Sequence, residues 1–175
     1  MKKSVLPAKF YLWLFLATIL TFLIHESAHW LMGTALGYTM TFHLNGVAAT
    51  TAMQPAHKAL VDAAGPLVTA LQGVVAFMLV FRSRQIVAYA FLYVAAFMRL
   101  LATAISLVHL NDEARLSQYV GLGTWTLPLL VTAGLVFLTW RASRHMQLTW
   151  LDHLWCYITA SIAIGAVVGV DRLLF

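Results

Sequence analysis

The chain has few charged residues and one cysteine. Asp, Glu, Lys and Arg make up 10% of its 175 residues, and six of these are acidic. Soluble domains carry about 25% charged residues, so an ordinary soluble domain is excluded. The lone Cys156 provides no disulfide framework and is interpreted as a packed thiol.

Hydrophobic residues, by contrast, make up 62% of the chain and occur in long runs. Divided at charged residues, glycines and prolines, these runs predict five membrane spans, at about residues 10–36, 58–81, 86–110, 120–140 and 150–171. The predicted fold class is therefore an all-α polytopic membrane protein. It forms one integral-membrane domain over residues 1–175, in contact with the lipid bilayer.

Basic residues collect at alternate span ends, which predicts an orientation. They are Lys2, Lys3, Lys9, Arg82, Arg84, Arg141 and Arg144. The positive-inside rule then places the N-terminus in the cytoplasm and the C-terminus outside. This pattern also accounts for the net charge of +5, and it gives no indication of a nucleic-acid partner.

An H-E-x-x-H motif, residues 25–29, lies inside the first hydrophobic run. Residues four apart share one face of a helix, so His25 and His29 can bind one metal ion while Glu26 reaches a water as general base. The alternative is two packed histidines and a chance glutamate. It is disfavoured because a charged side chain costs about 2.5–3.5 kcal/mol at the centre of a spanning helix. The motif predicts a catalytic zinc (Zn2+) site.

A catalytic zinc ion usually takes three protein ligands, so another residue must complete the site. The motif lies well along the first span, which places the metal toward the outer face of the membrane. Asp112 at the end of the third span is the favoured third ligand. Asp62 at the start of the second span is the alternative, unless it caps that helix or pairs with Lys58. Asp152 and Asp171 are expected to be solvated or paired.

Residues 38–53 are rich in threonine and apolar side chains and contain Asn45-Gly46, which favours a short membrane-associated β-hairpin between the first two spans. Such a hairpin would pack over the site and could pair with an extended substrate. His43 is a candidate there for a contact with the substrate or the oxyanion near the metal, although a plain loop histidine is the favoured interpretation. A plain connecting loop remains the alternative. His109, three residues before Asp112, is a further candidate for contact with that carboxylate or with a reacting carbonyl group, or else a simple interfacial histidine.

Two other features have structural explanations. Arg99 in the third span is expected to meet a carboxylate or a backbone carbonyl group inside the bundle. The Gly33-x-x-x-Gly37 and Gly165-x-x-x-Gly169 patterns permit close helix packing within the fold or between copies. A homo-oligomer or a regulatory membrane partner is compatible with them.

Three segments of the chain together resemble those of a known protein family. The H-E-x-x-H motif, the Ala64-Gly65-Pro66-Leu67 segment and the Asn111-Asp112 pair resemble the site-2 protease family of intramembrane zinc metalloproteases. The resemblance covers roughly residues 20–123, and the segment at 111–116 looks like that of the smaller bacterial branch. It implies a bacterial inner (plasma) membrane location and a membrane protein as substrate.

The resemblance also implies roles for individual residues. His25, His29 and Asp112 would bind zinc, and Glu26 would activate water. Family members often have an asparagine after the Gly-Pro segment that contacts the substrate or the oxyanion, whereas Thr69 occupies this position here. The family also commonly places zinc nearer the cytoplasm, while the charge pattern of this chain places it nearer the outside.

The predicted function is therefore hydrolysis of a peptide bond in a membrane protein. A non-catalytic zinc-binding scaffold or regulator of the same fold is the alternative, and Glu26 argues against it because a scaffold needs no general base. A metal transporter would need ligands at several depths, whereas the candidates here lie near one face.

Overall fold

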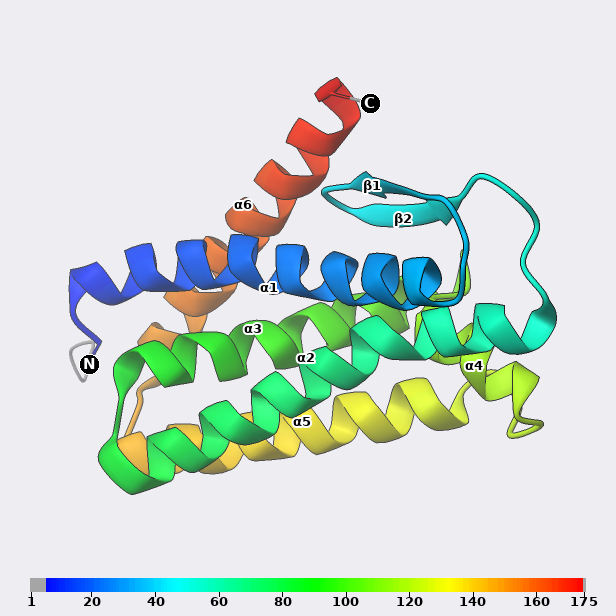
Figure 1. Cartoon of the computed structure of the whole chain (residues 1–175). Helices are drawn as coiled ribbons and strands as arrows, with labels where there is room; N and C mark the ends of the chain where they lie inside the picture. The colour runs from blue at the N-terminus through cyan, green and yellow to red at the C-terminus, as the bar shows by residue number, and fades with distance from the viewer. Residues whose placement is uncertain (1–5, 175) are drawn as a thin grey trace.

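The computed structural model describes residues 6–174, so Lys2 and Lys3 of the N-terminal basic cluster lie outside the described residues. Within that range the chain forms six helices and one two-stranded sheet (Figure 1). The elements are α1 (Ala8–Ala35), β1 (Met40–His43), β2 (Gly46–Ala49), α2 (Pro55–Ser83), α3 (Ile86–Ile105), α4 (Asp112–Tyr119), α5 (Thr126–Met146) and α6 (Trp150–Leu174). Five of these helices, all except α4, are long and apolar enough to cross a membrane. The predicted all-α polytopic fold is confirmed.

The predicted boundaries were wrong between the third and fourth spans. α3 ends at Ile105 instead of residue 110, and the fourth span begins at Thr126 instead of residue 120. The polar segment between them forms the separate helix α4, which the sequence analysis did not predict. The side chain of Asn111 caps this helix by accepting a hydrogen bond from the Ala114 backbone N–H at 2.8 Å. Asp112 therefore starts a short helix and does not end a span.

The β-hairpin is confirmed. β1 and β2 are antiparallel, with Met40 opposite Ala49 and His43 opposite Gly46. The turn residues are Leu44 and Asn45, one position earlier than the Asn45-Gly46 pair suggests. Gly46 is a strand residue.

The turn of this hairpin is tied to the end of α6. Asp171 Oδ1 accepts hydrogen bonds from the backbone N–H groups of Leu44, at 2.7 Å, and Asn45, at 3.3 Å. Asp171 is thus paired, as expected, but with backbone atoms 126 or more positions away. This contact holds the hairpin beside α1 and the C-terminal half of α6 (Figure 1).

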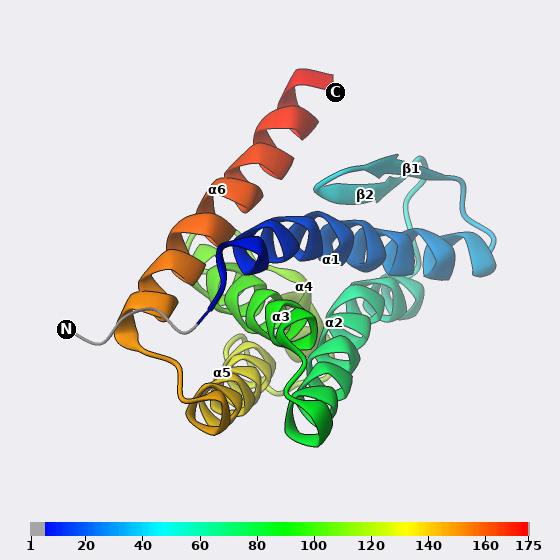
Figure 2. The ribbon, with the colours of Figure 1, turned by 90° about the vertical axis from the view of Figure 1, so that its left-hand side faces the viewer.

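The two ends of the molecule are formed by different elements. One end carries the start of α1 and the α2–α3 and α5–α6 connections, and the other carries the hairpin and α4 (Figure 1). α6 packs mainly against α1 and diverges from α5 toward the hairpin (Figure 2). At the first end, Asp152 is fully buried and accepts from the Leu6 and Thr149 backbone N–H groups, so it too is paired.

Candidate metal centre

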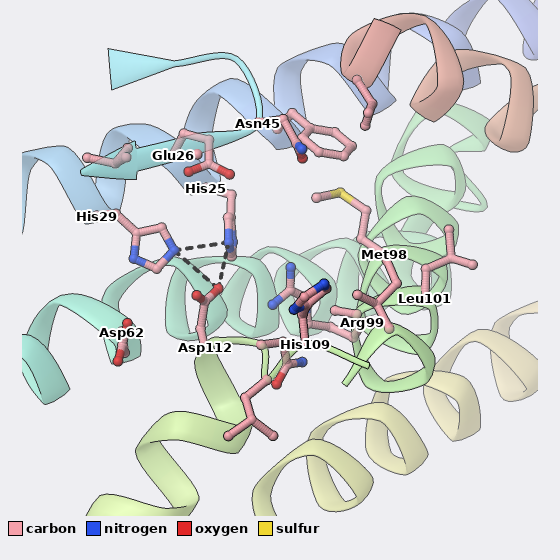
Figure 3. A pocket seen from close by; sticks show the side chains of 18 of the residues that line it. His25, Glu26, His29, Asn45, Asp62, Met98, Arg99, Leu101, His109 and Asp112 are labelled. Carbon is pink, nitrogen blue, oxygen red and sulfur yellow. Dashed lines mark hydrogen bonds and ion pairs between the residues drawn. The ribbon is translucent and has the colours of Figure 1, made fainter. Parts of the chain in front are cut away.

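The two motif histidines lie on one buried face of α1, where they meet Asp112 of α4 (Figure 3). Their Nε2 atoms are 3.1 Å apart, as expected for residues one helical turn apart. Asp112 Oδ2 lies 3.3 Å from each of these nitrogens. One ligand atom from each of the three residues therefore falls within 4.8 Å of the others.

Neighbouring groups determine which ring nitrogen of each histidine carries the proton. His29 Nδ1 lies 2.6 Å from the carbonyl oxygen of Val61, which can only accept, so Nδ1 must donate. His25 Nδ1 lies 3.0 Å from the Thr69 hydroxyl, and that hydroxyl donates its own proton to the carbonyl oxygen of Gly65. His25 Nδ1 must then donate as well. In both neutral rings, Nε2 is left with a free lone pair.

These lone pairs make the cluster suited to a cation. Two Nε2 atoms and one carboxylate oxygen face each other at 3.1–3.3 Å, and three acceptors at such distances repel unless positive charge lies between them. Two imidazoles and one carboxylate form a donor set of catalytic zinc sites and leave a fourth position open. Histidine ligands whose other ring nitrogen donates to an oxygen are also typical of such sites. The residues therefore fit a zinc ion.

Gly65 allows the second helix to approach the cluster. A Cβ atom at this position would lie 2.6 Å from His25 Cε1 and would also collide with His29 Nε2. The Ala64-Gly65-Pro66 segment of α2 thus passes directly against the two histidine rings. Only glycine leaves room for them.

Arg115 holds Asp112 in place from the side opposite the histidines. It donates from Nη2 to Asp112 Oδ1. A hydrogen bond donated by a guanidinium favours the charged form of a carboxyl group, and a metal ligand must be in that form.

Asp62, the alternative third ligand, is engaged elsewhere. Its Oδ1 accepts from Arg115 Nη2 at 2.8 Å, both of its oxygens lie 3.1 Å from Arg115 Nε, and Lys58 Nζ lies 3.3 Å away. The pairing with Lys58, one of the alternatives to a ligand role for Asp62, is present. The metal-type cluster found among the described residues contains Asp112 and not Asp62.

The cluster opens into a cavity of about 520 Å³. Glu26 lines it beside His25, and Figure 3 shows Glu26 and Asn45 on the hairpin side, with Asp112 and Arg99 on the opposite side. Glu26 is buried, with 7% of its surface exposed. The carboxyl group of Glu26 thus lines the same cavity as the metal-type cluster.

Of the three residues predicted to contact the substrate or the oxyanion, one lines the cavity. Thr69 is buried, and its hydroxyl is occupied by His25 and Gly65. His43 is half-buried in β1, and the hairpin residues that line the cavity are Asn45, Gly46 and Val47. His109 is exposed and does line the cavity, although it precedes α4 and does not share a helix with Asp112.

Arg99 meets a carboxylate inside the bundle, as predicted. Its Nη1 donates to Glu113 Oε1 at 2.9 Å, and both side chains are almost fully buried. The sequence analysis did not predict that Glu113 pairs with Arg99, and it did not predict that Arg115 donates to Asp112. Arg115 follows Asp112 by three residues at the start of a helix, and this spacing is a signal that would have predicted the second contact.

No family model, curated protein or solved structure matches this chain.

Proposed function

We propose that this protein is an intramembrane zinc metalloprotease that hydrolyses a peptide bond of a membrane protein substrate. One observation carries the proposal. The ligand atoms of His25, His29 and Asp112 converge at a cavity that the buried Glu26 also lines, among helices apolar enough to span a membrane. The resemblance to the site-2 protease family supports the same residues in the same roles.

Zinc would be held by His25, His29 and Asp112, and when bound it would polarise the scissile carbonyl group and lower the pKa of water toward about 7. A side chain of the protein carries out the proton transfers. Glu26 accepts a proton from water as the water oxygen bonds to the carbonyl carbon. It then returns that proton to the nitrogen as the carbon–nitrogen bond breaks. No covalent bond between enzyme and substrate forms.

The cavity suits an unwound segment of a membrane protein. A peptide bond in a helix has its carbonyl oxygen hydrogen-bonded and hidden, so the substrate must extend before it can react. The hairpin lies over the Glu26 side of the cavity and brings Asn45, Gly46 and Val47 to its wall. We assign the hairpin the role of receiving the extended segment.

We also propose a bacterial inner membrane location with the N-terminus in the cytoplasm. Among the described residues, five basic ones support this orientation. Lys9, Arg82, Arg84, Arg141 and Arg144 lie at the ends of α1, α2 and α5 that share one end of the molecule (Figure 1). The metal centre is at the other end, toward the outside.

The Glu26→Gln variant tests the proteolytic function. A comparison of membrane proteomes with wild-type protein and with Glu26→Gln should reveal a fragment that only the wild type produces. Cleavage of the membrane protein that yields this fragment should then fall by about 10²- to 10⁴-fold in the variant in liposomes, because glutamine keeps the shape of the side chain but accepts no proton.

Zinc content and a chelator serve as controls. The variant should keep its zinc, and a chelator should abolish cleavage by the wild type. Undiminished cleavage by Glu26→Gln would refute the role of Glu26. A biological function that survives the substitution would favour the scaffold alternative.

A further inference from the structure

Three arginines line the cavity in the described part of the chain, and they differ in what they can do there. Arg115 donates to Asp62, to Asp112 and to the carbonyl oxygen of Leu110, so its guanidinium is committed. Arg172 is exposed near the end of α6. Arg99 is 3% exposed and lies inside the bundle.

One hydrogen-bond donor of Arg99 has no partner among the described residues. Its Nη1 donates to Glu113 at 2.9 Å, whereas the buried Nε has no acceptor within residues 6–174. Leaving a buried donor without a partner costs about 1–3 kcal/mol. A side chain held at such a cost next to a candidate active site is a candidate for binding a ligand oxygen.

We propose that Arg99 binds the carbonyl oxygen of the scissile peptide bond and stabilises the negative charge that develops on it when water adds. This inference rests on the proposed hydrolytic function. Arg99 donates hydrogen bonds and transfers no proton, so the proton transfers remain those assigned to Glu26. The ligand class is the oxyanion of a peptide substrate.

The position of Arg99 fits this role. Figure 3 shows Arg99 and Asp112 on one side of the cavity and Glu26 on the other. A carbonyl group lying between them would turn its carbon toward the water activated by Glu26 and its oxygen toward Arg99. Opposite placement of the base and the oxyanion donor is what addition to a carbonyl group requires.

Glu113 fixes the orientation of the Arg99 guanidinium. Glu113 is 2% exposed and bonds Nη1, so the guanidinium is held in one orientation before the substrate arrives. A donor fixed in a medium of low dielectric stabilises a developing charge more than a mobile one in water does. The Thr69 hydroxyl, at the position where the resemblance implies a contact with the oxyanion, already donates to Gly65.

The test compares two zinc-binding peptides with the same leucine side chains. One carries a phosphinate, whose second oxygen imitates the oxyanion, and the other carries a thiol, which has no such oxygen. Dissociation constants are measured by titration calorimetry with zinc-loaded, full-length protein in detergent. Because Arg99→Gln alone would leave Glu113 as an unpaired buried charge, the variant is the double substitution Arg99→Gln with Glu113→Gln.

We expect the double variant to bind the phosphinate about 100-fold more weakly than the wild type and the thiol with less than about a threefold change. Two matched controls accompany it. Glu113→Gln alone retains Arg99 and should retain the preference for the phosphinate. Arg172→Gln removes a positive charge from the exposed end of the cavity lining and should leave both dissociation constants within about threefold of the wild type.

Two results would overturn the proposal. If the double variant weakens both peptides equally, or neither, Arg99 only supports the fold. If Arg172→Gln instead gives the selective loss, the oxyanion donor is on α6. Failure of the proposed function looks different, because zinc-loaded wild-type protein would then bind neither peptide.

Discussion

Arg115 Nη2 lies 2.8 Å from Asp62 Oδ1. The same guanidinium donates to Asp112, so it joins the second helix to the short helix that carries the proposed third ligand. Of the two aspartates considered as ligands, one therefore faces the histidines and the other supports the arginine behind it.

This relationship predicts the metal content of variants. Purified protein should contain about one zinc ion per chain, and His25→Ala, His29→Ala or Asp112→Ala should each remove most of it. Asp62→Asn should retain zinc, since Asp62 contacts Arg115 and not the cluster. Elemental analysis after dialysis measures the content. Full zinc in Asp112→Ala, or loss of zinc in Asp62→Asn alone, would reassign the third ligand.

Thr69 should control the affinity for zinc without touching it. Thr69→Val keeps the shape of the side chain but removes the acceptor for His25 Nδ1, so zinc should bind about 10- to 100-fold more weakly. Thr69→Ser keeps the hydroxyl and should bind zinc nearly as tightly as the wild type. Competition with a chelating dye measures both constants. Equal affinities in the valine and serine variants would contradict the role of the hydroxyl.

Gly65→Ala should disrupt the metal centre selectively. The added Cβ collides with both histidine rings, and overpacking of this kind costs about 1–3 kcal/mol. Zinc content should fall while circular dichroism still shows a helical protein. Gly134→Ala is the matched control in α5, because a Cβ there meets no atom within 4 Å. If the two variants hold equal amounts of zinc, α1 and α2 do not pack as described.

Asp171 should keep the hairpin ordered. Asp171→Ala removes the acceptor of the Leu44 and Asn45 N–H groups, so hydrogen exchange at these amides should accelerate at least about fivefold. Asp171→Asn retains one acceptor oxygen and should show a smaller increase. Unchanged exchange in Asp171→Ala would show that the hairpin is held by its own strand pairing.

Cysteine labelling in whole cells tests the orientation. Val108→Cys places a thiol at a site that is 79% exposed, near the metal centre, and Arg144→Cys places one at the basic end. A membrane-impermeant reagent should label the first in intact cells and the second only after permeabilisation. The native Cys156 is buried and should contribute little background. The reverse pattern would put the metal centre on the cytoplasmic side.

Local chemistry made part of this protein predictable from its sequence. Helical periodicity alone brings His25 and His29 to one face, and hydropathy alone identifies five spans. The Thr-rich segment with Asn45-Gly46 predicted a hairpin, because strand and turn preferences act between residues close in the chain. Its turn was displaced by one residue, since register also depends on what the strands pack against.

Only the tertiary structure decided which distant groups meet. Asp62 and Asp112 are equivalent as ligand types, and the choice between them depends on Arg115 and on the capped start of α4. The contacts between His25 and Thr69 and between Asp171 and Leu44 join residues 44 and 127 positions apart. Such contacts follow from how helices cross, and helix crossing is set by the packing of whole faces rather than by any local pattern of residues.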